Sequence, residues 1–182
     1  MLNRQILYKH ASTLPARAVY QATAMAVNSM QPERENRFLS VDDDQTQKIP
    51  FFFQFVIGSP IMFTTRIPEL EKSRVVANGQ LGVIVGYACK RKGSNSEFEV
   101  SAEVNGITMK RFRKLPDFLL IKIRNSKKAY SSLLPLGVIT VPPLKKACAT
   151  KLGPQIGQPP WCPTITQFPL ILSYAVTPEK IQ

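Results

Sequence analysis

Histidine and cysteine are scarce in this sequence of 182 residues. His10 is the one histidine, and Cys89, Cys148 and Cys162 lie far apart without a CxxC pair. Because a tetrahedral zinc site needs four such ligands close together, the sequence excludes a Cys/His zinc domain. An odd number of cysteines without an apolar leader also argues against a secreted disulfide scaffold and predicts a reducing, intracellular compartment.

Long apolar runs and nucleotide-binding motifs are absent as well. No stretch reaches the roughly 18 apolar residues of a membrane span, so we expect no membrane insertion. The phosphate-binding pattern GxxxxGK[ST] does not occur, and neither does the GxSxG of hydrolases. The chain is therefore expected to hold no cofactor and to hydrolyse no ATP by itself.

Positive charge is what the sequence has in excess, and it is unevenly placed. Residues 1–89 hold nine basic and seven acidic residues, whereas residues 90–182 hold fifteen and five, so +10 of the net +12 lies in the second half. Such a half attracts phosphate-bearing ligands and displaces their counterions, which makes nucleic acid the leading partner and an acidic membrane surface the second. The alternative is a basic protein that is merely soluble. A nucleic-acid partner predicts a nuclear or other intracellular location.

The first part of the chain predicts one helix and one acidic loop. Pro15 is a favourable first helical residue, and apolar residues from Ala16 to Met30 recur at helical spacing, so a helix is expected to end before Pro32. Residues 31–48 are polar and include three consecutive aspartates, at 42–44, which lack the alternation of a calcium-binding loop. This stretch is expected to be a solvated surface loop.

The middle of the chain predicts strands. Six short runs are rich in β-branched and aromatic residues: 51–57, 60–65, 81–87, 97–104, 107–112 and 118–123. Asn105 and Gly106 separate two of them and tolerate the positive φ of a type I′ turn, which predicts an antiparallel hairpin. Several short strands with turns between them predict a small antiparallel barrel or sandwich from about residue 50 to residue 125.

Proline dominates the next part of the chain. Seven prolines lie between residues 135 and 163, and the stretch 142–163 is expected to hold little regular structure. The apolar run 168–176 is strand-like, and the sequence then ends without a closing element, which indicates truncation. We therefore expect four parts: a helix and loop segment (1–49), a small β-domain (50–125), a Pro-rich connection (126–166) and a final strand (167–182).

The basic residues of the second half form clusters. The first two are Lys90, Arg91 and Lys92, before the predicted hairpin, and Lys110, Arg111, Arg113 and Lys114, at the end of its return strand; Lys127–Lys128 and Lys145–Lys146 with Lys151 follow. Loops of this kind can follow a phosphate backbone, and Phe112 or Tyr130 can offer a ring to a base. The alternative is that charged loop tips keep a barrel soluble.

An aromatic run precedes these clusters. Phe51, Phe52 and Phe53 are consecutive, and Phe55 follows. Aromatic runs are more common in cores than on recognition surfaces. Two of these rings are therefore expected to fill the core and the others to cover a neighbouring segment.

The order of several motifs resembles Pif-type (RecD-like) DNA helicases and their Helitron-transposon relatives. IGSPIMF at 57–63 and VANGQLGVIVGY at 76–87 resemble the family's VGAPVML and VNGTRGVVVGF stretches. LPDFLLIK at 115–122 is similar to PPYVLVKL, and LGVITVPP at 136–143 to GVIPIxP. QFPLILSYAVT at 167–177 resembles the opening of helicase motif V, and Asn28 with FLSVD at 38–42 resembles an earlier segment, so the resemblance covers nearly the whole chain.

The resemblance implies a second motor domain that carries an inserted Src-homology-three-like barrel. Thr177, Lys180 and Gln182 match the threonine, the basic residue and the glutamine of motif V, which contacts the tracking strand. Pro178 removes a backbone donor there and Glu179 repels phosphate, so this motif is expected to be impaired.

The sequence is thus expected to be α+β and mainly β: a small antiparallel Src-homology-three-like barrel inserted in an incomplete RecA-like second motor domain. Its expected function is that of a DNA-binding fragment of an ATP-dependent helicase of repair, recombination or transposition, with single-stranded DNA or another nucleic acid as partner. ATP and Mg²⁺ belong to the full family motor, so a missing N-terminal motor half is the second expected partner. The alternatives are a basic β-barrel adaptor that binds proteins through the Pro-rich segment, and a remnant that no longer folds.

Overall fold

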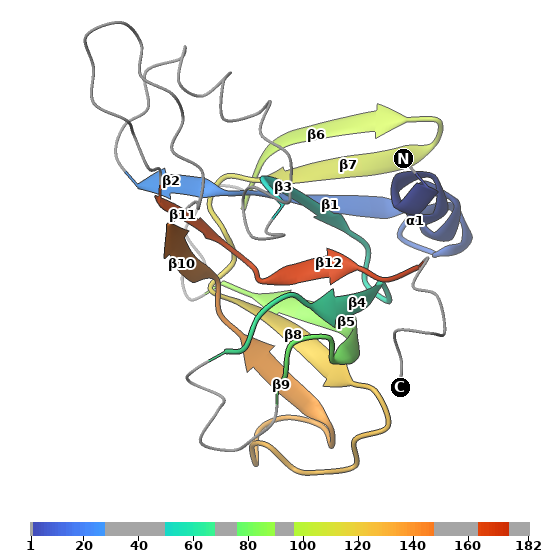
Figure 1. Cartoon of the computed structure of the whole chain (residues 1–182). Helices are drawn as coiled ribbons and strands as arrows, with labels where there is room; N and C mark the ends of the chain where they lie inside the picture. The colour runs from blue at the N-terminus through green and yellow to red at the C-terminus, as the bar shows by residue number, and fades with distance from the viewer. Residues whose placement is uncertain (1, 28–49, 68–75, 90–96, 148–163, 175–182) are drawn as a thin grey trace, which may run out of the picture.

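The computed structural model describes residues 2–27, 50–67, 76–89, 97–147 and 164–174. These residues form one helix, α1 (Leu2–Thr13), and three open sheets (Figure 1). Sheet A has the order β3 (Phe52–Phe55), β1 (Ala18–Thr23), β7 (Ile107–Phe112) and β6 (Phe98–Val104). Sheet B has the order β10 (Leu144–Ala147), β11 (Thr164–Gln167) and β2 (Met25–Val27). Sheet C has the order β12 (Leu170–Leu172), β4 (Pro60–Phe63), β5 (Leu81–Ala88), β8 (Phe118–Ile123) and β9 (Val138–Val141).

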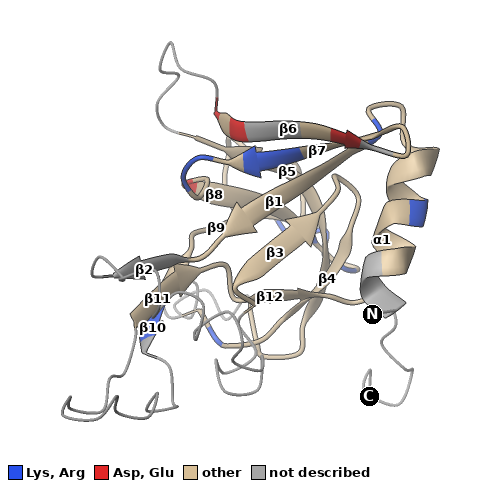
Figure 2. Cartoon of the chain, turned by 90° about the horizontal axis from the view of Figure 1, so that it is seen from above, with Lys and Arg blue, Asp and Glu red and all other residues tan. Residues whose placement is uncertain are grey.

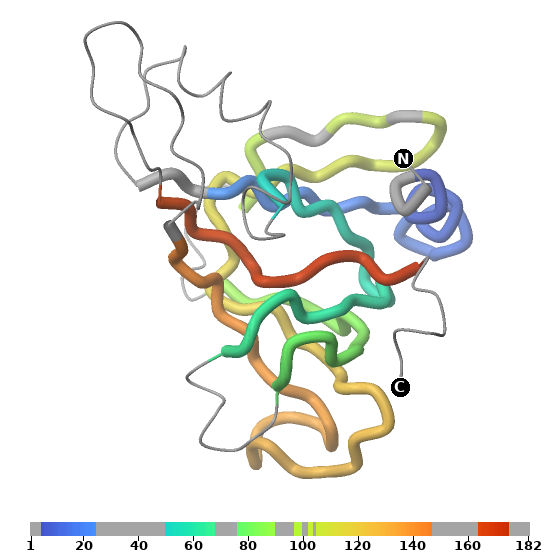
Figure 3. The backbone as a smooth tube through the Cα atoms, in the orientation of Figure 1, coloured from blue at the N-terminus to red at the C-terminus, as the bar shows by residue number. Residues whose placement is uncertain are grey.

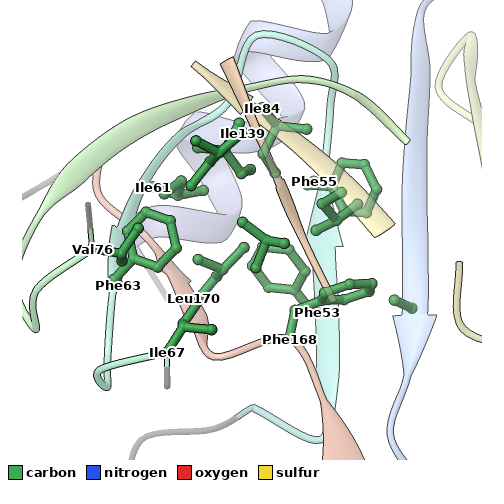
Figure 4. Packing of buried hydrophobic residues seen from close by; sticks show 14 of the residues in the cluster. Phe53, Phe55, Ile61, Phe63, Ile67, Val76, Ile84, Ile139, Phe168 and Leu170 are labelled. Carbon is green, nitrogen blue, oxygen red and sulfur yellow. The ribbon is translucent and has the colours of Figure 1, made fainter. Parts of the chain in front are cut away.

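The main hydrophobic core lies between sheets A and C. Alternation along β8 turns Leu119, Ile121 and Ile123 to one side, where they are buried against the inner face of sheet A. Phe53 and Phe55 of β3 enter the same core from sheet A and meet Phe168 and Leu170 there (Figure 4). The expectation that two rings of the aromatic run are buried in the core is therefore confirmed.

A second, smaller core lies on the outer face of sheet A. Leu7 and Ala11 of α1 pack there against Val19, Val56 and Ile107. Sheet A is therefore covered by sheet C on one face and, over part of the other face, by α1.

The predicted strands and hairpin of the middle region are confirmed. Strands β3 to β8 fall in the six predicted runs: β5 to β8 agree with them to within one residue at each end, and β3 and β4 each end two residues early. Val104 pairs with Ile107 across a two-residue turn in which Asn105 has φ 52° and Gly106 has φ 73°. Both values are positive, as a type I′ turn requires.

The predicted helix from residue 15 to the residues before Pro32 is wrong. The helix lies earlier and ends at Thr13, whereas residues 18–23 and 25–27 are strands β1 and β2. Strand β1 lies between β3 and β7 and is covered on both faces, so Ala18, Val19, Gln21 and Ala22 are all buried. A strand buried on both faces loses the alternation that identifies strands, and its apolar residues can then imitate helical spacing.

The described residues form no closed barrel, contrary to the expectation for residues 50–125. Strand β1 inserts between β3 and β7, which places β3, β6 and β7 in sheet A and β4, β5 and β8 in sheet C. Strands β9 and β12, from later in the chain, then complete the edges of sheet C. The mainly β character is confirmed.

Three strands, β9, β10 and β11, lie in segments for which the sequence predicted neither helix nor strand. Strand β10 falls within the Pro-rich stretch and pairs with β11, and β11 pairs in turn with β2. Figure 3 shows how the chain then runs on from β11 into β12 (red), which pairs with β4. Strand β9 also went unpredicted, although its sequence Val-Ile-Thr-Val is rich in β-branched residues.

The loop between β8 and β9, residues 124–137, closes tightly at its base. Ile123 N donates to Gly137 O at 2.8 Å, and Gly137 N donates to Lys128 O at 2.7 Å. Gly137 has φ 75°, and a Cβ atom at this position would collide with Ser126 O. Gly79 has a similar φ of 84° but open space around the position of its missing Cβ.

These two glycines give a matched test of the closed loop. We expect Gly79→Ala to cost about 1 kcal/mol, because a non-glycine residue is strained at positive φ. Gly137→Ala should cost a further ~1–3 kcal/mol, because the backbone at Ser126 has to move. Urea unfolding of both variants measures the difference, and equal losses would show that the loop is not closed as described.

Candidate nucleic-acid interface

The end of β7 carries the basic cluster that the sequence singled out. Alternation along the strand turns Lys110 and Phe112 toward sheet C and Arg111 toward the opposite face. Arg111, Arg113 and Lys114 are exposed, whereas Lys110 is half-buried. The structure therefore brings three of these four residues to the surface and partly buries the fourth.

Lys110 lies over an aromatic cluster. Its Nζ atom is 5.4 Å from the ring centroid of Phe98 and 6.0 Å from that of Tyr20. The Tyr20 ring in turn stacks on Phe55 at 5.6 Å and on Phe112 at 6.0 Å. A cation over such rings is stabilised by about 0.5–1 kcal/mol, so Lys110 is held against the sheet.

The expected role of Phe112 in base stacking is wrong. Its ring is 3% exposed and packs edge-on against Tyr87, with centroids 5.0 Å apart. A base needs an open ring face to stack on, and this ring has none. Contacts between nucleic acid and this end of the sheet must therefore rely on charge and hydrogen bonds.

Arg113 anchors the end of β7 to the start of β6. Its backbone N donates to Glu97 O at 3.1 Å, and its Nε donates to Phe98 O at 3.2 Å. The hydrogen bond through Nε fixes the side chain, so the guanidinium group is held in place at the surface. A fixed guanidinium loses little conformational freedom when it binds an anion.

A polar row crosses the outer face of sheet A beside Arg111. Gln21 pairs with Arg111 on one side and with Gln54 on the other, and the Gln54 amide donates to Gln21 Oε1 at 2.8 Å. Nothing in the sequence marks the two glutamines as neighbours, because they belong to strands far apart in the chain. Gln54 places a half-buried amide in this row, whereas Gln21 is buried and supports the row from within the sheet.

Acidic residues on β6 restrict the direction from which an anion can approach. Glu99 and Glu103 are exposed on this edge strand (Figure 2), and Glu99 lies nearer to the cations of β7 because Glu103 pairs with Thr108. A phosphate that approached over β6 would meet these carboxylates. The favourable approach is therefore toward the end of β7 and the residues that follow it, where Arg113 and Lys114 lie.

Burial disfavours the charged forms of the nearby tyrosines and of the cysteine. Burial raises the pKa of Tyr87 to about 12, with smaller contributions from Tyr20 and Glu97. Burial also raises the pKa of Tyr20 and of the Cys89 thiol. A thiol with a raised pKa is a poor nucleophile, so this part of the sheet offers no reactive cysteine.

Two parts of the predicted site lie outside the described residues. They are the cluster Lys90, Arg91 and Lys92, and the motif V residues Thr177, Lys180 and Gln182. Cys89 and Glu97, which flank the first cluster, both lie near the cationic end of β7, because Glu97 accepts from Arg113 and contributes to the pKa of Cys89. The roles of these six residues stay predictions.

A partly buried polar network ties three distant parts of the chain together. Tyr174 OH lies 2.7 Å from His10 Nδ1 and 3.0 Å from Ser59 Oγ. Ser59 is fully buried and also accepts from Val56 N at 2.9 Å. His10 therefore belongs to helix α1 and to this network, and its separation from Tyr174 by 164 residues explains why no local pattern in the sequence predicts the pairing.

Among the described residues, no group of three or more His, Cys, Asp and Glu side chains is placed to hold a metal ion. No described helix is long and apolar enough to cross a membrane.

Ser59 and Tyr174 should differ in their importance for stability. Ser59→Ala leaves the buried Val56 N–H without its acceptor, which is expected to cost about 1–3 kcal/mol. Tyr174→Phe keeps that bond and loses only the hydroxyl contacts, at about 0.5–1.5 kcal/mol. Chemical denaturation of the two variants measures both losses. A larger loss in Tyr174→Phe than in Ser59→Ala would contradict this assignment.

Tyr87 should make the fold sensitive to alkali. Its pKa in the folded chain is about 12, above the ordinary value of 10.0. The unfolded chain therefore loses this proton first, and stability falls as pH rises from 10 toward 12. Tyr87→Phe should show a shallower fall in the free energy of unfolding over this range, with parallel curves below it. Identical curves throughout would contradict the raised pKa.

The sequence matches no protein-family model and no curated protein. Solved structures do resemble the fold. Pif1 helicase from Candida albicans is similar over 99% of this chain and 33% of its own, with a TM-score of 0.50 and 13% identity. Bacteroides Pif1 bound to ssDNA covers 99% of this chain and 30% of its own, at a TM-score of 0.46 and 12% identity.

The chain thus spans about a third of the length of the Candida albicans helicase. At this level of identity the likeness concerns the fold. The expected resemblance to Pif-type helicases is confirmed to that extent: the chain has a fold that is similar to a part of Pif1 helicase.

Proposed function

We propose that this chain is a nucleic-acid-binding part of a Pif-type DNA helicase, and that it holds single-stranded nucleic acid through the end of β7. The observation that carries the proposal is the group of exposed cations there, Arg111, Arg113 and Lys114. They lie in the half of the chain that holds +10 of its net charge, on a fold that is similar to a part of a helicase.

The geometry suits a phosphate backbone better than it suits bases. Guanidinium groups bind phosphate through two parallel hydrogen bonds, and they need no particular base. The aromatic rings beneath them are packed against one another, so they are not available for stacking. Binding should therefore be indifferent to base sequence and strongly dependent on salt.

The finer assignments belong to the same proposal. Lys90, Arg91 and Lys92 would extend the contact with the strand, and Thr177, Lys180 and Gln182 would serve as an impaired motif V. The parent activity would be ATP-dependent unwinding in repair, recombination or transposition, in the nucleus or another intracellular compartment. The region would be the second motor domain with its Src-homology-three-like insertion, in a Helitron-like branch.

ATP and Mg²⁺ would be held by another part of such a motor. The given sequence contains no GxxxxGK[ST] loop, and a motor converts hydrolysis into a step by binding its nucleotide between two domains. We therefore assign to these residues the holding of the strand and no catalytic step.

Charge reversal at the end of β7 tests the proposal. Arg111→Glu with Lys114→Glu should weaken binding of a labelled oligothymidylate at least roughly tenfold in dilute salt. The slope of log K against log salt should become shallower by about 1.4, because each phosphate contact on a single strand contributes ~0.7. Fluorescence anisotropy over a salt series measures both quantities.

A matched control separates the site from net charge. Lys9→Glu with Lys145→Glu lowers the net charge from +12 to +8, as the test pair does, at exposed positions on α1 and β10. This control should keep most of the affinity. If both pairs weakened the affinity for the oligothymidylate equally, the effect would come from overall charge rather than from the site. A wild-type chain that did not bind the oligothymidylate would overturn the proposal.

A further inference from the structure

The β8–β9 loop, residues 124–137, displays two large apolar side chains to solvent. Leu133 is 91% exposed and Leu136 is 56% exposed. Single exposed leucines are ordinary, but two within four residues form the kind of apolar tip that marks an interaction site. Figure 1 places this loop at the end of the molecule opposite the β6–β7 hairpin, away from the candidate nucleic-acid interface.

Internal hydrogen bonds hold the loop in shape. Lys122 Nζ donates to Leu136 O, and Gly137 N donates to Lys128 O. Within the loop, Ser126 Oγ lies 2.8 Å from Tyr130 OH, and Leu133 N donates to the Ser131 hydroxyl at 3.1 Å. Because these contacts exist without a partner, a partner that binds here does not have to order the backbone first, which favours binding.

The loop is cationic, and its own part of the chain offers nothing to neutralise it. Arg124, Lys127 and Lys128 are exposed around the leucines. From residue 118 to residue 178 the sequence holds seven Lys or Arg and no Asp or Glu. A partner that complements this surface therefore brings negative charge as well as apolar side chains.

Three other occupants suit this surface less well. Single-stranded nucleic acid is bound through cations and open aromatic faces rather than through aliphatic leucines, and the Tyr130 ring packs against the main core and has Lys128 Nζ 5.6 Å from its centroid. Anionic membranes are bound by clusters of about four to eight cations, whereas only three of the cations around these leucines are exposed and Lys122 is bonded within the loop to Leu136 O. A second copy of a chain with net charge +12 is repelled.

We propose that the β8–β9 loop is a docking site for an acidic protein segment that carries apolar side chains. Leu133 and Leu136 are the anchors, and Arg124, Lys127 and Lys128 pair with the flanking carboxylates. This site is separate from the proposed nucleic-acid interface and does not depend on it.

A random-peptide library displayed on phage and selected against the whole chain tests the proposal. The enriched sequences should combine Asp or Glu with Leu, Ile, Phe or Trp. The strongest of them, synthesised with a fluorescent label, should bind the wild-type chain and lose at least about tenfold in affinity to Leu133→Ser with Leu136→Ser. Lys127→Glu with Lys128→Glu should weaken the same peptide and provides a second variant that leaves the leucines in place.

Two matched controls define the site. Val85→Ser removes an apolar side chain that is 43% exposed on β5 and should leave peptide binding unchanged. Arg111→Glu with Lys114→Glu should also leave it unchanged while weakening oligothymidylate binding, so the two proposals fail or hold separately.

Three results would overturn the docking site. The first is a selection that yields no acidic–apolar peptides. The second is a peptide whose affinity is the same for the wild-type chain and for both loop variants. The third is that the wild-type chain binds phosphatidylserine vesicles or the oligonucleotide and that the leucine variant loses this binding. That result would assign the loop to one of those ligands instead.

Discussion

The fold depends on the position of strand β1. It pairs antiparallel with β3 and parallel with β7, and it thereby joins the start of the chain to a strand about ninety residues later. Its Tyr20 ring lies against Phe55, Tyr87, Phe98 and Phe112. Without β1, strands β3 and β7 would not belong to one sheet, and the rings that support Lys110 would lose their common centre. Closing so long a loop lowers the conformational entropy of the chain, and the packing of these rings has to offset that loss.

This packing also decides which residues face outward. The inner face of sheet A is filled with rings, so it has no room for bases, and the cations that follow Phe112 in the sequence reach the surface at the end of the strand. The guanidinium of Arg113 is fixed by its bond to Phe98 O, and Arg111 extends a row of amides. A rigid strand end is a more precise support for charged groups than a loop tip is. At the other end of the molecule the β8–β9 loop combines cations with exposed leucines, so the two basic regions differ in chemistry and suit different partners.

Local patterns in the sequence predicted local structure well. Asn105 and Gly106 carry a turn preference that needs no tertiary support, and the alternation along β8 directly reflects a sheet with one buried face. Long-range structure was less accessible. The helix expected after Pro15 is a strand because its neighbours come from later in the chain, and the expected barrel is open because that same strand enters the sheet. His10 gave no signal of its own, since its partners, Ser59 and Tyr174, are brought to it only by the fold.

In the candidate site, too, the local pattern was predictable from the sequence and the tertiary arrangement was not. The sequence identified Lys110, Arg111, Arg113 and Lys114 as a cluster, but strand alternation separates Lys110 from Arg111, and burial removes Phe112 from the surface.

The most direct measurement of the central claim is the NMR spectrum of the arginine side-chain Nε–H groups during titration with an oligothymidylate. The account predicts that Arg111 and Arg113 shift with the added strand while Arg17 and Arg124 stay in place. Shifts at Arg124 alone, or no arginine shift at saturation, would contradict it.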